Sequence, residues 1–185
     1  MEYSPEERSL LLGLAHRAIA AALRGEKVDM TPPSEHLAQP RGAFTTLHIE
    51  GRLRGCVGYL SAAYSLYRTV AETAVSAAFQ DTRFLPVTLE ESSRLQIEIS
   101  VLSPMFPISA DQVEVGTHGL LIRKGGRSGL LLPQVPLEYG WDRLMFLQQT
   151  CYKAGLPPDA WQHGAALEAF TAEVFGETSP ALAES

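Results

Sequence analysis

The chain has 185 residues, of which 45% are hydrophobic and 19% charged, and its formal net charge at pH 7 is −6. This length suits one domain that buries about two thirds of its unfolded surface. The composition excludes a disordered or fibrous protein. The acidic balance also argues against a nucleic-acid-binding protein, whose charge is typically basic.

Several signals indicate a cytoplasmic protein without membrane association. The first residues are acidic where an export signal is basic. The longest apolar stretch, residues 10–23, is interrupted by His16 and Arg17 and is too short to span a bilayer. The two cysteines, Cys56 and Cys151, form neither a disulfide framework nor a zinc motif. We therefore expect two free thiols, no metal and no cofactor.

The first half of the chain predicts helices around a β-hairpin. Ser4, Pro5 and Glu7 form a capping-box pattern before an apolar helical stripe that ends near Gly25. Residues 31–40 hold three prolines and are predicted to be a loop. Strands are expected at 43–49 and 52–60, a helix at 66–79, a loop at 80–86, a short helix after Thr88 and a strand at 95–103.

The second half predicts strands at 119–124 and 130–132, a long helix at 141–154 and a final strand at 167–175. Short turns between strands, with helices between groups of strands, indicate an α+β fold in which a mainly antiparallel sheet is flanked by helices. We expect a single domain over residues 1–176 and a flexible tail at 177–185.

The strand at 52–60 carries the most informative residues. Alternation places Leu53, Val57 and Tyr59 on a core face and puts Arg54 and Cys56 together on the other face. A nearby positive charge favours the thiolate, which is the form of cysteine that acts as a nucleophile. Two structural alternatives stay open, because free cysteines often pack as small hydrophobic residues and an arginine often forms a structural ion pair.

Four more polar residues are candidates. Asp81 and Arg83 lie in the loop after the second helix, and form either a clamp that shapes the loop or a ligand site in which Arg83 binds an anion. Glu98 is the expected partner of Arg54 if their strands are close. His118, next to Gly119, is the best general-base candidate, although a turn histidine without a role is the simpler interpretation. Cys151 shares a helical stripe with Leu144, Leu147 and Ala154, which indicates packing in a core.

Several motifs occur together in one order. LRGCVG stands at 53–58, GAFTTL at 42–47 and AAFQDTRF at 77–84. ISVLS at 99–103, GLLLPQV at 129–135 and KAGL at 153–156 follow. This pattern, which covers residues 5–176, resembles the AMMECR domain family, whose bacterial and archaeal members are called AmmeMemoRadiSam system protein A.

The resemblance implies a larger and a smaller lobe, with Arg54, Cys56, Asp81 and Arg83 near a cleft between them. It also implies an association with Memo-type and radical SAM proteins. The chain has no cysteine trio for an iron–sulfur cluster, so it is not itself the radical SAM partner.

Three hypotheses follow. The first is a subunit that acts with Memo-type and radical SAM proteins. It would bind a partner protein or a small anionic ligand through Arg54, Cys56, Asp81 and Arg83. The second is an enzyme with Cys56 as nucleophile, Arg54 favouring the thiolate, and His118 or Asp81 as the base. The third is RNA binding through a local basic patch formed by Arg52, Arg54, Arg83, Arg123, Lys124 and Arg127.

Overall fold

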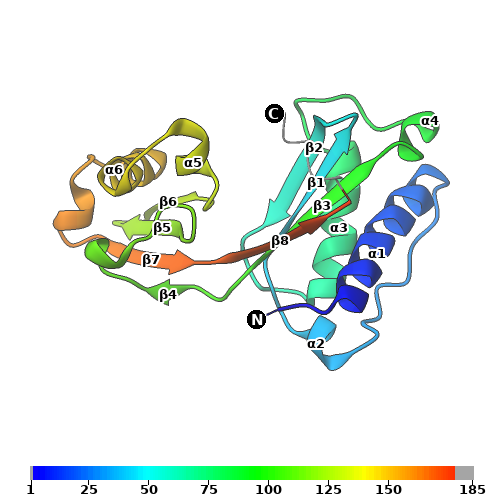
Figure 1. Cartoon of the computed structure of the whole chain (residues 1–185), viewed down its shortest axis with the longest axis horizontal. Helices are drawn as coiled ribbons and strands as arrows, with labels where there is room; N and C mark the ends of the chain where they lie inside the picture. The colour runs from blue at the N-terminus through cyan, green and yellow to red at the C-terminus, as the bar shows by residue number, and fades with distance from the viewer. Residues whose placement is uncertain (1, 178–185) are drawn as a thin grey trace, which may run out of the picture. The chain divides into compact units, whose positions relative to one another are not determined.

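The computed structural model describes residues 2–177, which form an α+β fold with two antiparallel sheets (Figure 1). The chain divides into two compact units. Unit 1 takes in the residues up to Leu102 and those from Glu173 onward, and unit 2 is Ser103–Ala172. Each sheet belongs to one unit, so the single mainly antiparallel sheet that we expected is replaced by two. The cleft between two lobes stays a prediction.

Unit 1 is a four-stranded sheet with two helices on one face (Figure 1). The helices are α1 (Pro5–Leu23) and α3 (Leu66–Phe79). The strand order is β2-β1-β3-β8, with β1 at Ala43–Ile49, β2 at Arg52–Tyr59, β3 at Gln96–Leu102 and β8 at Ala172–Gly176. Alternate strand residues such as Leu47, Ile97 and Ile99 are fully buried against the helices, which is the pattern of a sheet with one covered face.

Local sequence signals placed most of these elements correctly. The capping boxes at Ser4 and Thr88 both form, and they begin α1 and the short helix α4 (Leu89–Ser92). The proline-rich loop contains one helical turn that was not expected, α2 (Glu35–Ala38), which is capped by Ser34.

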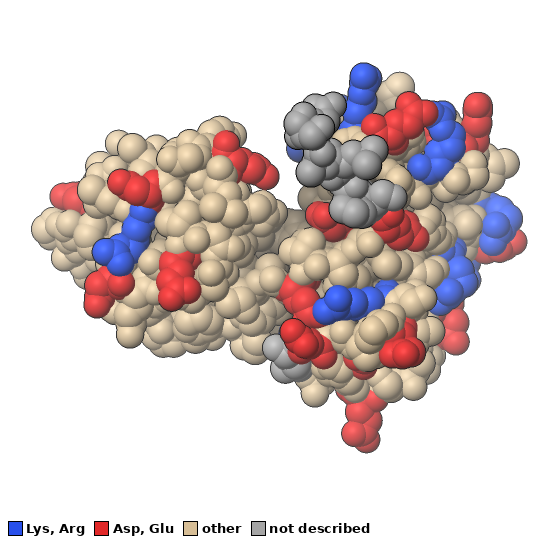
Figure 2. All heavy atoms as spheres, viewed as in Figure 1, with Lys and Arg blue, Asp and Glu red and all other residues tan. Residues whose placement is uncertain are grey.

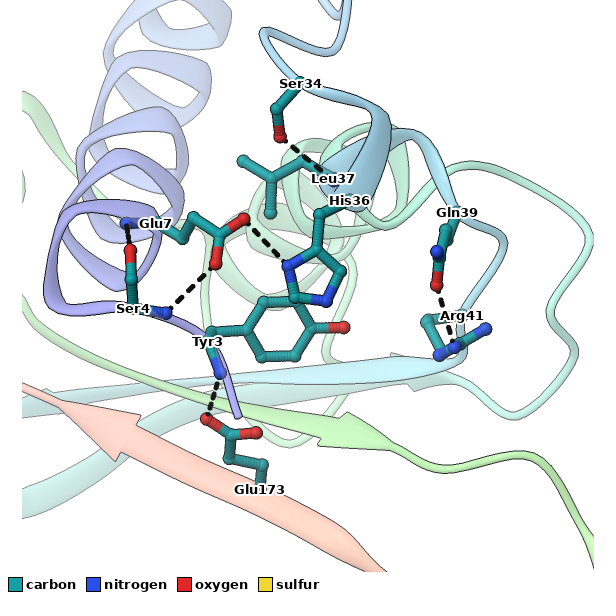
Figure 3. A network of polar contacts seen from close by, with 9 residues as sticks. All are labelled: Tyr3, Ser4, Glu7, Ser34, His36, Leu37, Gln39, Arg41 and Glu173. Carbon is teal, nitrogen blue, oxygen red and sulfur yellow. Dashed lines mark hydrogen bonds and ion pairs between the residues drawn. The ribbon is translucent and has the colours of Figure 1, made fainter. Parts of the chain in front are cut away.

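The start of the chain is tied to the end of unit 1 by a polar network (Figure 3). The backbone N–H of Tyr3 donates to Glu173 Oε1 on β8 at 2.9 Å. The Tyr3 ring stacks on His36 of α2, with 4.6 Å between ring centroids, and His36 Nδ1 lies 2.8 Å from Glu7 Oε1. The chain segments before α1, in α2 and in β8 are therefore held together by side chains. Burial raises the pKa of Tyr3.

Unit 2 contains the second sheet, with strand order β4-β7-β5-β6. The strands are β4 (Phe106–Pro107), β5 (Gly119–Lys124), β6 (Arg127–Leu131) and β7 (Ala166–Phe170). Helices α5 (Val135–Tyr139) and α6 (Arg143–Lys153) belong to this unit, as do the 3-10 turns η1 (Ala110–Gln112) and η2 (Ala160–Gln162).

The prediction of one final strand at 167–175 was wrong. The strand is interrupted at Thr171. As a result, β7 belongs to the sheet of unit 2 and β8 belongs to the sheet of unit 1. The expected tail at 177–185 lies outside the described residues except for Glu177. The backbone N–H of Glu177 donates to the carbonyl of Ile97 at 3.0 Å. No helix within residues 2–177 is long and apolar enough to cross a membrane.

Gly55 lies very close to the backbone of a neighbouring helix, whereas Gly13 does not. We therefore predict that replacing each glycine by alanine changes stability differently. A Cβ on Gly55 of β2 would lie 2.2 Å from the carbonyl oxygen of Ala77 in α3. We expect Gly55→Ala to lower the free energy of unfolding by about 1–3 kcal/mol or more, because the backbone has to move. Urea unfolding followed by circular dichroism measures this effect.

Gly13→Ala in α1 is the matched control. Its Cβ would meet only the flexible end of Arg17, at 3.1 Å. Alanine is favoured over glycine inside a helix by up to about 1 kcal/mol, so this variant should be as stable as the parent or more stable. Equal destabilisation by both substitutions would contradict the packing described for Gly55.

Candidate functional site

The residues of the LRGCVG motif lie on β2, which is an edge strand of its sheet. A register shift between Leu47 and His48 interrupts the pairing of β1 with β2, so that Gly55 pairs with Leu47 but Leu53 pairs with His48. Arg54 is the extra residue of this bulge. Bulges redirect side chains, and the simple alternation that we expected is broken here. Leu53, predicted in the core, is 41% exposed.

Arg54 therefore binds a different carboxylate from the one expected. Its Nε and Nη2 donate to the two carboxylate oxygens of Glu91 on α4, at 2.9 and 3.0 Å. Glu98, the expected partner, instead lies opposite Thr46 in the pairing of β1 with β3. The hydrogen bonds from Arg54, and then the backbone N–H of Thr88, lower the pKa of Glu91 to about 2.

Asp81 is the second anchor of this region. Its carboxylate accepts the backbone N–H of Cys56 at 2.9 Å, and it accepts Nε and Nη2 of Arg83 at 3.0 and 2.7 Å. The Asp81 side chain is only 6% exposed. The Arg83 side chain above all, together with the backbone N–H groups of Cys56 and Arg83, holds the pKa of Asp81 well below its usual range. The structure shows the ion pair of the clamp interpretation, and the ligand site at Arg83 stays a prediction.

Cys56 has a thiol that is partly exposed and hydrogen-bonded across the sheet. Because its backbone N–H points to Asp81, away from β1, Cys56 and Thr46 form a pair without backbone hydrogen bonds, the type in which side chains come closest. Accordingly, Cys56 Sγ lies 3.3 Å from Thr46 Oγ1. Cys56 also adds to the electrostatic effects that raise the pKa of Arg83, among which the hydrogen bond to Asp81 comes first. Arg83 and the backbone of Cys56 thus share Asp81 as a partner, while Arg54 binds Glu91.

The two expected bases, Asp81 and His118, belong to different units. Asp81 binds the backbone of Cys56 and not its thiol. His118 belongs to unit 2, where its Nδ1 accepts the backbone N–H of Glu114 at 3.0 Å and its ring meets Phe106 edge-on. Within residues 2–177, no group of three or more histidine, cysteine or acidic side chains is arranged to hold a metal. The roles of Asp81 and His118 as bases stay predictions.

Five of the six basic residues considered for RNA binding are paired within their own unit. Arg54, Arg83 and Arg123 are each paired with a carboxylate. Lys124 and Arg127 donate to backbone carbonyls within unit 2. On the face drawn in Figure 2, basic side chains lie beside acidic ones and do not form a continuous stripe.

The sequence did not lead us to expect an exposed apolar surface on the segment between α3 and α4. Leu85 is 83% exposed and Leu89 is 71% exposed, the two highest values among the exposed large hydrophobic residues of the described chain. Arg83, in the same segment, is 57% exposed. The Phe84 ring lies near two guanidinium groups, whose Cζ atoms are 5.9 Å (Arg54) and 5.5 Å (Arg83) from the ring centroid. The signal was present in the sequence, since the loop after α3 contains Leu85 and the short helix after Thr88 begins with Leu89.

The ion pair between Arg54 and Glu91 predicts a dependence of stability on pH. The pKa of Glu91 is lower in the folded protein than the value of about 4.3 in an unfolded chain. Its contribution is therefore complete above that value and is lost as the pH falls toward 2. We expect Glu91→Gln to lower the free energy of unfolding by about 1–3 kcal/mol at pH 7, because Arg54 loses a charged partner.

Urea unfolding at several pH values between 7 and 2 tests this expectation. The difference between Glu91→Gln and the parent should shrink as the solution becomes acidic. Glu90→Gln is the matched control, since Glu90 is an exposed neighbour in α4 with no ion pair to a described residue. A difference that stays constant over the whole range would show that the charge of Glu91 contributes nothing.

The two cysteines should differ in reactivity. Cys151 is fully buried and burial raises the pKa of its thiol, whereas Cys56 is partly exposed. With iodoacetamide, we expect one adduct on the folded protein, at Cys56, and a second only under denaturing conditions. Intact mass spectrometry of the parent, with Cys56→Ser and Cys151→Ser as controls, distinguishes the sites. Equal labelling rates would contradict the burial of Cys151.

The relatives of this chain cover almost its full length. The AMMECR1 family model matches residues 12–175. Protein MK0488 of Methanopyrus kandleri is 42% identical over 187 residues, which is 95% of this chain and 90% of that protein. A protein of Aquifex aeolicus is 39% identical and covers 92% of both chains. The crystal structure of the uncharacterized protein PH0010 from Pyrococcus horikoshii matches with a TM-score of 0.80 at 40% identity, over 92% of this chain and 91% of that one. With its fold, its motifs and this coverage, the chain belongs to the AMMECR1 family.

Proposed function

We propose that this protein is a partner-binding subunit that acts with Memo-type and radical SAM proteins. Its partner contacts the surface formed by Arg83, Leu85 and Leu89, which we name the α3–α4 surface. The observation that carries the proposal is the exposure of the two leucines, 83% and 71%, on a segment that is firmly held. Exposed apolar patches mark interaction sites in soluble proteins, and Leu85 and Leu89 are four positions apart on one segment.

The segment is held at both ends by ionic anchors. At its start, Asp81 binds the backbone of β2 and the side chain of Arg83. At its end, Glu91 binds both Arg54 and the backbone N–H of Thr88. A surface that is already ordered loses less conformational entropy on binding, so these ion pairs favour recognition although they contribute no chemistry.

The roles of the motif residues divide accordingly. Arg54 and Asp81 are mostly buried and hold the segment. Arg83 is the motif charge available to a partner, because its Nη1 has no hydrogen-bond partner among the described residues while its other nitrogens bind Asp81. The corresponding Nη1 of Arg54 is also unpartnered but buried. A small anionic ligand, or a carboxylate of the partner, therefore has access to Arg83 and not to Arg54.

The cysteine-dependent alternative has less support. Cys56 has a hydroxyl neighbour, Thr46, but no base bonded to its thiol within the described chain. A nucleophile normally requires such a base within hydrogen-bond reach. The proposed binding role does not require a reactive thiol at Cys56.

Removing the leucines should weaken partner binding without unfolding the protein. We expect Leu85→Ser combined with Leu89→Ser to reduce affinity for the Memo-type or radical SAM protein of the same genome at least about tenfold, because exposed apolar anchors contribute most at interfaces. Co-purification followed by surface plasmon resonance measures this loss.

Leu137→Ser is the matched control, because Leu137 is 61% exposed but lies in unit 2. It should bind like the parent. If the parent protein binds neither candidate partner at low salt, the proposed function is wrong. If it binds and the double variant binds equally well, the α3–α4 surface is not the contact.

A further inference from the structure

Unit 2 contains a groove with an apolar floor and two opposite charges at its rim. Its volume is about 420 Å³.

 

The groove is lined by Ala110, Asp111, Arg143, Leu144, Leu147 and Trp161. All six residues belong to unit 2, where they come from η1, the first half of α6 and η2. The volume falls in the range of small-molecule sites, about 300–1,000 Å³. The groove is therefore large enough for a small metabolite.

The floor and the edge of the groove are apolar. Leu147 is 2% exposed and Trp161 packs against the same core cluster, so both are fixed in place. Leu144, which the helical stripe predicted to be buried, is 51% exposed and lines the groove. Its position gives the groove an apolar wall that a bound side chain can cover.

The two charges have hydrogen-bonding capacity to spare. Arg143 Nη1 donates to the backbone carbonyl of Asp111 at 2.7 Å, and its Nε and Nη2 have no partner among residues 2–177. The carboxylate of Asp111 forms no ion pair with another described residue. Asp111 is ionised at neutral pH like an ordinary aspartate, and its pKa is lowered further, first by a hydrogen bond from the Ser109 side chain.

We propose that this groove binds a small zwitterion with an apolar side chain, of the class of a free α-amino acid such as leucine or phenylalanine. The two unused nitrogens of Arg143 suit a carboxylate, which guanidinium groups bind in a bidentate way. Asp111 accepts from the ammonium group. The apolar side chain packs on Leu147 and Trp161. The groove shares no residue with the α3–α4 surface, and the proposal does not depend on the proposed function.

Trp161 provides a direct readout. The chain has two tryptophans, and Trp141→Phe leaves Trp161 as the only one, while a phenylalanine can still stack on Tyr139. The full-length Trp141→Phe protein is titrated with L-leucine, and its tryptophan emission is recorded. We expect a saturable change with a dissociation constant of about 0.1–1 mM, which is reasonable for so small a ligand.

Blocked ligands and variants test the two charge contacts. N-acetyl-L-leucine and L-leucine amide each lack one charge and should bind about tenfold more weakly or not at all. Asp111→Asn and Arg143→Gln should weaken L-leucine to the same extent. Glu114→Gln is the control, because Glu114 is an exposed carboxylate of the same unit that does not line the groove. Circular dichroism shows whether each variant is folded.

Two results would overturn the proposal. The first is the absence of any saturable change up to about 10 mM L-leucine or L-phenylalanine. The second is equal affinity for the free and the blocked forms, which would leave only an apolar groove without recognition of a zwitterion.

Discussion

The arrangement of unit 1 depends on the missing side chain at Gly55. Without a Cβ, strand β2 lies directly against the carbonyl of Ala77, near the end of α3. This contact brings Asp81, which follows α3, to the free edge of β2, where its carboxylate accepts the backbone N–H of Cys56. An edge strand with open N–H groups can pair with other chains, and Asp81 occupies one of these groups. One glycine thus allows the helix, the strand edge and the loop to meet.

The charged residues of the motifs are used within the protein. Arg54 binds Glu91 and Arg83 binds Asp81, and these bonds hold the segment between α3 and α4 at its two ends. The same bonds leave Leu85 and Leu89 exposed. An arrangement of this kind favours recognition of a partner, because the free energy spent on ordering the segment is supplied by folding and not by binding. The thiol of Cys56 contacts the hydroxyl group of Thr46.

Much of the fold follows from local signals. The capping boxes at Ser4 and Thr88, the helix at Leu66–Phe79 and the strands at Ala43–Ile49 and Gly119–Lys124 could all be predicted, because capping and periodicity act over a few neighbouring residues. The candidate site was predicted in part. Arg54, Cys56, Asp81 and Arg83 do lie in one region of unit 1, but their pairing was not predicted.

The sequence by itself determined the α+β class, most element boundaries and the family. Only the tertiary structure decided the rest. The bulge in β2 directs Arg54 to Glu91, and the interruption at Thr171 places β7 and β8 in different sheets. The tertiary structure also places Asp111, Arg143 and Trp161 around one groove. The physical reason is the same in each case. These outcomes depend on contacts between residues far apart in the chain, whose partners are set by strand register and packing, and no local pattern records them.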